Sequence, residues 1–164
     1  MNIYDVIVVG GGHAGCEAAH ASARLGSKTL LITMKIDGIG QMSCNPAIGG
    51  IGKSHLAREV DALDGLMCKS ADDASLQSRV LNLSKGAAVR ATRIQTCRDE
   101  YKKAMQKDIL NHENLTVLQS TVKSVKFSKN RAEGVVIETG DYIKSKCVVL
   151  TAGTFLGGVI HMGE

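Results

Sequence analysis

The feature that most constrains the fold is a run of glycines placed directly after the first apolar segment. Residues 3–9 are short and apolar, and residues 10–15 are Gly-Gly-Gly-His-Ala-Gly. An Ala-rich segment then predicts a helix over residues 14–25, and residues 28–33 predict a second strand. A strand, a glycine turn, a helix and a strand in this order predict a βαβ unit, whose strands are parallel because a helix connects them.

The glycine turn fits the pattern G-x-G-x-x-G of dinucleotide-binding folds. Gly10 permits a tight turn, Gly12 lets the backbone approach a pyrophosphate, and Gly15 lets the helix pack close to the strand. Backbone N–H groups at the start of the helix would bind the phosphates. Because the pattern lies inside a βαβ unit, we predict dinucleotide binding here rather than a glycine turn of purely structural use.

The residues at the end of the second predicted strand do not identify the cofactor. An acidic residue that binds ribose hydroxyls is expected there, but the sequence has Thr33 and Lys35. Thr33 would hydrogen-bond a ribose less strongly than a carboxylate, and Lys35 would favour the 2′-phosphate of NADP.

The second half of the chain favours FAD. Residues 115–118 predict a third parallel strand, and residues 121–127, 132–138 and 142–144 predict an antiparallel meander. Residues 147–151 are continuously apolar, which predicts a parallel strand buried on both faces. A meander before a parallel strand that ends in Thr-x-Gly-Thr resembles the FAD-binding domain of two-dinucleotide-domain flavoproteins. The expected fold class is α/β and Rossmann-like, with a parallel sheet and an antiparallel β-meander.

The middle of the chain is predicted to hold a glycine-rich loop over residues 34–54 and helices over residues 55–63 and 94–110. Residues 49–54, Gly-Gly-Ile-Gly-Lys-Ser, are similar to the end of a P-loop. A P-loop would need a glycine where Ala47 stands and a strand just before it, so binding of ATP or GTP is disfavoured.

The cysteines point to a reducing compartment. There are five, an odd number without a C-x-x-C pair, which favours free thiols over disulfides or a zinc site, and we expect no metal. Cys44 lies in the predicted loop, where a thiol is available for chemistry. The other four lie on predicted helices or strands, where a buried thiol acts as a small hydrophobe and reacts slowly.

The composition is that of a globular protein, with 44% hydrophobic and 22% charged residues. The longest charge-free stretch, residues 147–163, is interrupted by polar and glycine residues and falls short of the ~20 apolar residues that span a bilayer. The N-terminus runs from Asp5 directly into an apolar segment without the basic region of a signal peptide, which predicts a first strand instead. We therefore expect no membrane contact and a cytoplasmic location.

Basic residues concentrate between residues 79 and 107, which contain eight Lys or Arg residues and two acidic residues. Part of this run falls in a predicted loop over residues 84–93, and basic loops are typical of phosphate recognition. The candidate RNA-binding residues are Lys85, Arg90 and Arg93. The alternative is a charged surface that is only solvated.

Four stretches carry a resemblance to a known family: residues 10–19, 40–53, 59–63 and 84–93. Together they closely resemble the MnmG family, also called GidA, and the resemblance runs over all 164 residues. It implies an FAD enzyme that, with the GTPase MnmE, adds a (carboxymethyl)aminomethyl group to the wobble uridine of tRNA. The resemblance further implies methylene-tetrahydrofolate as one-carbon donor, NADH as flavin reductant, and a cytoplasmic homodimer.

The resemblance also implies roles for individual residues. Cys44 matches one of two functionally important cysteines and is the catalytic candidate, while Val122 would lie against the adenine. The other expected cofactor-binding residues are Gly10, Gly11, Gly12, His13, Ala14 and Gly15 at the pyrophosphate, with Thr33, Gly153 and Thr154.

Members of this family are several times longer than this chain. We therefore expect residues 1–164 to be the N-terminal part of an FAD-binding domain, apparently truncated and inactive alone. Two alternatives remain: an FAD- or NAD(P)-dependent oxidoreductase without an RNA role, and a non-catalytic nucleotide-binding fragment.

Overall fold

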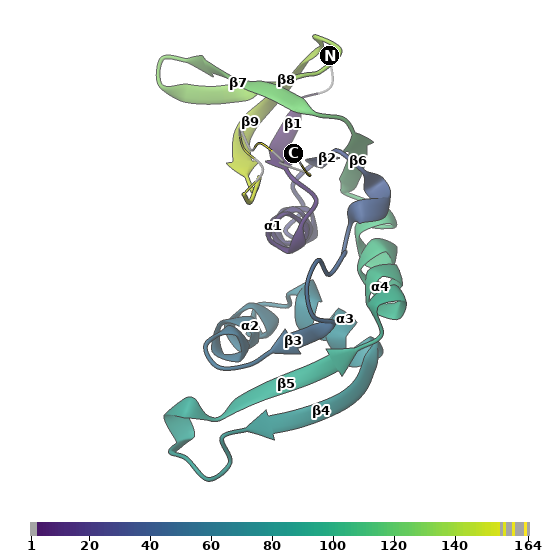
Figure 1. Ribbon diagram of the computed structural model, residues 1–164. Coiled ribbons are helices and arrows are strands. Elements are labelled where there is room, and N and C mark those ends of the chain that lie inside the picture. Colours follow the sequence, from purple (N-terminus) through teal and green to yellow (C-terminus); the bar gives the residue numbers. More distant parts are fainter. Residues whose placement is uncertain (1–2, 155, 157–158, 160–162, 164) are drawn as a thin grey trace.

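The computed structural model describes residues 3–154 together with residues 156, 159 and 163. It contains two β-sheets connected by helices (Figure 1). The six-stranded sheet, in the upper part of Figure 1, has the strand order β6-β2-β1-β9-β8-β7. The three-stranded sheet, in the lower part, has the order β3-β5-β4.

Four of the six strands in the larger sheet pair in parallel. Strand β1 (Tyr4–Val9) pairs in parallel with β2 (Thr29–Thr33) on one side and with β9 (Tyr142–Leu150) on the other. Strand β2 in turn pairs with β6 (Leu115–Gln119). Counting only these four, the spatial order is 3-2-1-4, which is that of a Rossmann-like sheet. Helix α1 (His13–Arg24) connects β1 to β2, so the predicted βαβ unit is confirmed.

The predicted meander is confirmed with one correction. Strands β7 (Val122–Ser128) and β8 (Arg131–Ile137) are antiparallel, and the start of β9 pairs antiparallel with β8. The two strands predicted over residues 142–144 and 147–151 are a single strand, β9. Its first part belongs to the meander and its second part to the parallel sheet, so the strand continues through residues 145 and 146.

The prediction that residues 147–151 are buried on both faces was wrong. Val149 packs in the core beside the helices and Val148 in the core beneath the meander. Cys147 is exposed, and Leu150 is 57% exposed. Among residues 147–150, the described helices and strands thus cover only Val148 and Val149.

Two cores lie on opposite faces of the six-stranded sheet. Because successive side chains of a strand point to opposite faces, Val8 and Leu31 pack beneath the helices while Ile7 and Ile32 pack beneath the meander. The helix-side core also contains Tyr101, the one aromatic side chain among the largest fully buried ones described. The other buried members of the two cores are aliphatic or sulfur-containing side chains.

The three-stranded sheet comes from the part of the chain that was predicted least well. It consists of β3 (Ala47–Gly49), β4 (Ser75–Leu81) and β5 (Ala91–Thr96). Short 3₁₀ turns lie at η1 (Ile36–Gly38) and η2 (Ala87–Val89), and the helices of this region are α2 (Lys53–Ala62), α3 (Leu66–Asp73) and α4 (Arg98–Leu110).

The predicted helix over residues 94–110 begins only at Arg98. The spacing of Ile94, Cys97 and Tyr101 fits a helix, but Ile94 belongs to β5 and pairs with Ile48 of β3. Pairing with strands on both sides overrides a helical pattern read from spacing alone. The predicted loop over residues 34–54 likewise contains η1 and β3.

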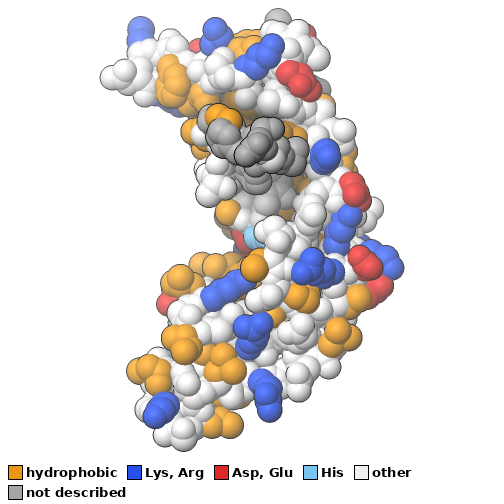
Figure 2. All heavy atoms as spheres, viewed as in Figure 1, with side chains coloured by type: hydrophobic (Ala, Val, Ile, Leu, Met, Phe, Trp, Pro, Cys, Tyr) orange, Lys and Arg blue, Asp and Glu red, His pale blue; other side chains and the backbone are white. Residues whose placement is uncertain are grey.

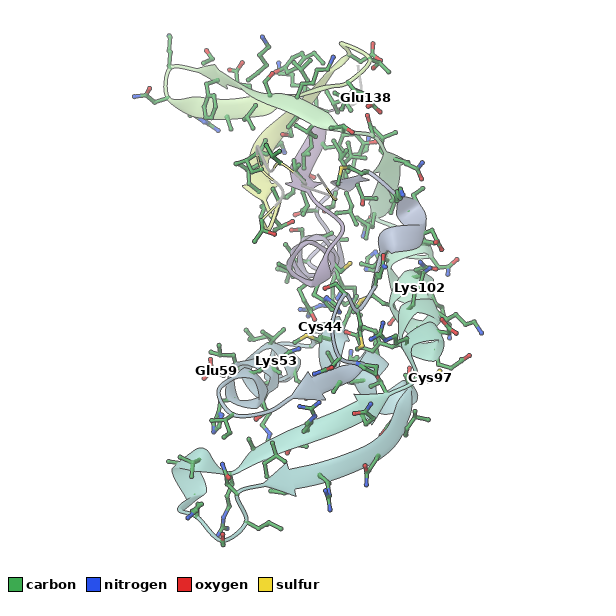
Figure 3. All side chains as sticks on the ribbon, in the orientation of Figure 1. Cys44, Lys53, Glu59, Cys97, Lys102 and Glu138 are labelled. Carbon is green, nitrogen blue, oxygen red and sulfur yellow. The ribbon has the colours of Figure 1, made fainter. Side chains whose placement is uncertain are left out.

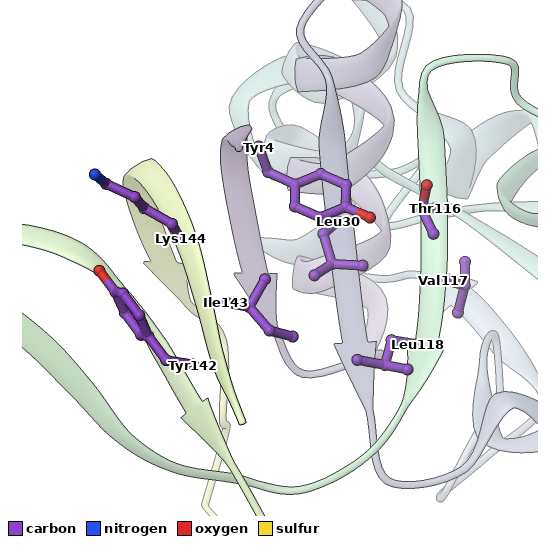
Figure 4. A pocket seen from close by; sticks show the side chains of 8 residues that line it. All are labelled: Tyr4, Leu30, Thr116, Val117, Leu118, Tyr142, Ile143 and Lys144. Carbon is purple, nitrogen blue, oxygen red and sulfur yellow. The ribbon is translucent and has the colours of Figure 1, made fainter. Parts of the chain in front are cut away.

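A groove of about 340 Å³ lies between strands β1, β2 and β6 and the start of β9 (Figure 4). Its lining includes Tyr4, Leu30, Tyr142 and Ile143. Tyr4 and Leu30 lie toward the amino ends of β1 and β2, whereas ligands of open α/β sheets bind at the carboxyl ends. This groove is therefore not the predicted cofactor site.

Two further observations concern the described part of the chain. None of its helices has the length and apolar character needed to cross a bilayer. Within the same residues, no cluster of His, Cys, Asp or Glu side chains is suited to hold a metal ion.

Candidate functional site

The predicted cofactor-binding residues lie at one edge of the six-stranded sheet. The glycine turn follows the carboxyl end of β1, Thr33 is the last residue of β2, and Val122 follows β6 by a short connection. Gly153 and Thr154 follow β9. The carboxyl ends of parallel strands form the crevice in which open α/β sheets bind their ligands. The structure therefore brings these sequence-predicted residues together.

Three glycines of the turn are required by close packing. A Cβ atom at Gly15 would overlap the Gly10 carbonyl oxygen, and one at Gly11 would lie 2.6 Å from Thr33 Oγ1. Gly10 has φ +109°, and a Cβ atom there would lie 2.5 Å from the Thr151 carbonyl oxygen. These glycines let β1, β2, β9 and α1 converge, as the sequence pattern predicts for the tight turn and the close helix.

Gly12 differs from the other three. It has φ −73°, a conformation open to any residue, and no atom of the described residues lies within 4 Å of the position that its Cβ would occupy. Gly12 is the N-cap of α1 and makes no side-chain capping bond, so the first-turn N–H groups face an open approach. Packing therefore does not require glycine here, whereas the approach of a phosphate group would.

Thr151 locks the turn in place and was not predicted as a site residue. Its hydroxyl donates a hydrogen bond to the Val9 carbonyl at 2.8 Å and approaches the Gly10 carbonyl at 3.0 Å. The Thr151 N–H also donates to Val9 at 2.9 Å. The Thr-x-Gly-Thr motif pointed to Gly153 and Thr154 instead, and only the pairing of β9 with β1 reveals the role of Thr151.

The ends of β2 and β6 are tied together beside the turn. The Ser120 N–H donates to the Thr33 carbonyl at 2.9 Å, and the Ile36 N–H donates to Gln119 Oε1 at 3.1 Å. The Thr33 hydroxyl donates to the Lys35 carbonyl at 3.3 Å, which leaves its oxygen as an acceptor. A ribose contact by Thr33 stays a prediction, as does the adenine contact of Val122, which packs against the meander core.

His13 directs part of its side chain into the protein. Its ring lies 5.6 Å from that of Tyr101, and its Nε2 atom is buried without a hydrogen-bond partner among the described residues. Burial lowers the pKa of His13, and the nearby Lys53 lowers it further. The neutral imidazole therefore packs under the turn, while the backbone N–H groups remain the phosphate ligands that the motif predicts.

Glu17 makes a contact that local sequence patterns did not reveal. Its carboxylate accepts hydrogen bonds from the Leu66 N–H at 3.0 Å and the Met67 N–H at 2.7 Å. Both donors belong to the first turn of α3, which has no side-chain cap of its own. Glu17 thus caps α3 from α1 and joins the glycine turn to the region of the three-stranded sheet.

Cys44 lies in the segment between η1 and β3 and is exposed. In Figure 3 it is labelled in the region between α1 and the three-stranded sheet. The Arg98 guanidinium donates to the Cys44 carbonyl, and the Thr96 N–H donates to the Pro46 carbonyl at 2.8 Å. The end of β5 and the start of α4 therefore hold this segment while the thiol stays accessible.

The prediction for the other four cysteines holds fully for Cys16 alone. Cys16 is fully buried, and burial raises the pKa of its thiol to about 12. Cys68 is half-buried, and burial also raises its pKa. Cys97 is the N-cap of α4 and not a residue within the helix, and Cys147 is exposed. Cys147 is therefore exposed, as Cys44 is.

The predicted RNA-binding residues belong to the β4–β5 hairpin. Lys85 and Arg90 lie at its tip, where Arg90 Nε donates to the Lys85 carbonyl at 3.2 Å. Asn82 Nδ2 closes the tip by donating to the Val89 carbonyl at 3.0 Å. Arg93 is not in the predicted loop but in β5, because the strand begins at Ala91. These residues thus lie on a different sheet from the glycine turn.

Comparison with known proteins shows what this chain is similar to. A family model described as Glucose inhibited division protein A matches residues 5–164. The structure of Aquifex aeolicus GidA in its form II crystal is similar with 48% sequence identity and a TM-score of 0.94. The match covers 99% of this chain and 27% of that one. The form I crystal gives 47% identity, a TM-score of 0.95 and the same coverage.

More distant structures share the fold alone. The GidA-related protein from Thermus thermophilus is 19% identical with a TM-score of 0.61, over 95% of this chain and 56% of that chain. The probable FAD-dependent monooxygenase PqsL from Pseudomonas aeruginosa is 15% identical with a TM-score of 0.62, over 90% and 42%.

The chain spans about a quarter of the length of Aquifex GidA. The agreement nevertheless extends over nearly the whole of this chain, from the glycine turn through the Cys44 segment and the β4–β5 hairpin to the end of β9. The chain therefore belongs to the Glucose inhibited division protein A (GidA) family.

Proposed function

We propose that this chain is the FAD-binding portion of a flavoenzyme that modifies tRNA. The observation that carries the proposal is the open approach to the first turn of α1 at Gly12, at the carboxyl edge of a Rossmann-like sheet in a GidA-family chain. The packed glycines beside it build the turn, and Gly12 leaves room for a pyrophosphate.

The residues around this edge would hold the two ends of the dinucleotide. Backbone N–H groups at His13, Ala14 and Gly15 would bind the pyrophosphate. Val122 would contact the adenine, and the oxygen of Thr33 would accept a hydrogen bond from a ribose hydroxyl. Gly153 and Thr154, which follow β9, would lie toward the flavin half. Bound FAD would supply the redox chemistry.

We assign Cys44 to the chemistry of the substrate. Its support is exposure together with the fixed backbone, since Arg98 holds the Cys44 carbonyl. A thiol in this position is available for covalent chemistry, whereas Cys16 is enclosed in the core.

Family membership supports the remaining parts of the proposal, which concern the full-length protein. There we propose that a homodimer in the cytoplasm works with the GTPase MnmE, takes its one-carbon unit from methylene-tetrahydrofolate and uses NADH to reduce the flavin. The 164-residue chain alone would be inactive in this reaction.

The test has two steps. FAD should raise the melting temperature of the purified chain, while NADP should not. In full-length protein, Cys44→Ser should keep FAD and abolish wobble-uridine modification, and the exposed control Cys147→Ser should keep both. Stabilisation by NADP alone would refute the cofactor assignment, and retained modification in Cys44→Ser would refute the role of Cys44.

A further inference from the structure

The face of the three-stranded sheet that points away from α2 and α3 carries two arginines directly opposite each other. Arg93 of β5 pairs with Arg79 of β4, and Gly49 of β3 pairs with Arg93 on its other side. Ile94, the next residue along β5, packs against the helix-side core. Because side chains alternate along a strand, the two arginines share the opposite face, which we call the outer face.

This pairing of like charges is not compensated within the described structure. Residues directly opposite in an antiparallel pair have Cβ atoms about 5 Å apart, and like charges there destabilise the sheet. Neither guanidinium has an ion-pair or hydrogen-bond partner among the described residues. Four other arginines, Arg24, Arg58, Arg90 and Arg98, donate to oxygen atoms. Arg131 of β8 has no such partner among the described residues either, but no second arginine is paired with it in the sheet.

The surroundings of the pair are also basic. Residues 74–98 include five Lys or Arg residues and no Asp or Glu. Figure 2 shows blue side chains spread over the lower part of the molecule, where the β4–β5 hairpin lies, with little red among them. Two guanidinium groups without partners on such a basic surface favour the binding of an anionic ligand.

Next to the arginine pair, the outer face carries small or uncharged residues. Beyond Gly49, the neighbouring row across the three strands is Ala47, Gln95 and Gln77. Gly49 has φ +103°, and a Cβ atom there would overlap the Thr92 carbonyl oxygen. Small residues on β3 and amides on β4 and β5 leave an extended backbone room to lie beside the arginines.

The outer face runs from the hairpin tip toward Cys44. Lys85 and Arg90 lie at the tip, and the Arg79–Arg93 row follows along the strands. The row of Ala47, Gln95 and Gln77 comes next, and Cys44 lies three residues before Ala47 along the chain.

We propose that the outer face is an RNA-backbone site in which Arg79 and Arg93 together grip one phosphate group. The proposal rests on the proposed function, which makes tRNA the polyanion. Two guanidinium groups offer planar pairs of N–H donors that match phosphate oxygens, and the bound charge relieves their mutual repulsion. Arg79 thereby joins Lys85, Arg90 and Arg93 as an RNA-binding residue, and the path directs the RNA toward Cys44.

The experiment is tRNA filter binding to full-length protein across a salt series. Removing one bond between an arginine and a phosphate should reduce the log–log salt slope by about 0.7 to 0.9. We expect this reduction for Arg79→Gln and for Arg93→Gln, with FAD binding retained. Arg131→Gln, which removes an exposed arginine at the start of β8, is the matched control and should leave the slope unchanged.

Two further arms separate this proposal from the proposed function. Lys85→Gln tests the hairpin tip, and the melting temperature of Arg79→Gln tests the fold. Relief of repulsion should leave that melting temperature equal or higher. If Lys85→Gln lowers the slope and Arg79→Gln does not, the outer face is not the site, although tRNA binding stands. If wild-type protein fails to bind tRNA, the proposed function itself is wrong.

Discussion

At the scale of single residues, the glycine turn separates into two kinds of glycine. Gly10, Gly11 and Gly15 fill positions where any side chain would meet backbone or Thr33, whereas no described residue lies within 4 Å of the Cβ position of Gly12. The sequence pattern assigned distinct roles to these glycines, and the geometry shows which substitution would damage folding and which would damage binding.

Gly15→Ala should destabilise the apo chain because its Cβ would overlap the Gly10 carbonyl oxygen. Overpacking of this kind costs about 1–3 kcal/mol or more, since backbone must move to accept the new atom. Gly12→Ala, at an open position with negative φ, should change stability far less. Urea unfolding of the two apo variants measures the difference. Equal unfolding midpoints would contradict the assignment.

A second residue-scale prediction concerns thiol accessibility. Iodoacetamide near neutral pH should label Cys44 and Cys147, which are exposed, well before Cys16. Cys16 is fully buried, and its raised pKa of about 12 leaves little thiolate to react. Peptide mapping by mass spectrometry after timed quenching reads out the order. Early labelling of Cys16 in folded protein would show that the packing around α1 is wrong.

At the scale of elements, a contact between helices connects the two parts of the molecule. The Glu17 carboxylate of α1 accepts two N–H groups from the first turn of α3. Glu17→Ala should therefore lower the free energy of unfolding by about 1–2 kcal/mol. Glu59→Ala, an exposed position of α2 labelled in Figure 3, is the control and should stay within about 0.5 kcal/mol. Similar urea midpoints for both variants would remove Glu17 as a cap.

Elements whose signals are local could be predicted from the sequence. The βαβ unit, β6 and the meander each follow from short apolar runs and turn residues that lie within one segment. The three-stranded sheet could not be predicted in this way, because β4 is exposed along nearly its whole length and shows no alternation of apolar residues. Its existence depends on pairing with β5, whose own pattern imitates the start of a helix.

The residues of the candidate site also divide into those with a local sequence signal and those without one. The glycine motif identified the residues that follow β1, because the residues that define the motif lie next to one another in the sequence. Thr151 and Glu17 were missed, since each acts through a partner distant in the sequence, Val9 and Leu66 respectively. Such contacts appear only after the strands and helices are assembled.

At the scale of the whole molecule, two histidines couple folding to pH. Burial lowers the pKa of His13 and of His20 below the usual 6.5, and Lys53 near His13 and His112 near His20 lower it further. Protons thus bind more readily to the unfolded chain, so stability is present above pH 6.5 and is lost as the pH falls below it toward the lowered values.

The free energy of unfolding should therefore decrease from about pH 7 to about pH 5, a window above that in which carboxylates titrate. The His13→Gln/His20→Gln double variant should show a weaker pH dependence there, and the exposed His55→Gln variant should behave as wild type. Urea unfolding across this window is the measurement. An unchanged pH dependence in the double variant would contradict the burial of these side chains.

The whole account depends on the open approach at Gly12 serving a dinucleotide. The most direct test is a titration of FAD into the purified protein, followed by flavin fluorescence, for wild type, Gly12→Val and Gly86→Val. Gly86 is the matched control, because it also has negative φ and no described residue within 4 Å of its Cβ position, but it lies on the β4–β5 hairpin. We predict that Gly12→Val remains folded and loses FAD binding, while Gly86→Val binds as wild type does. FAD binding by folded Gly12→Val with wild-type affinity would contradict the account.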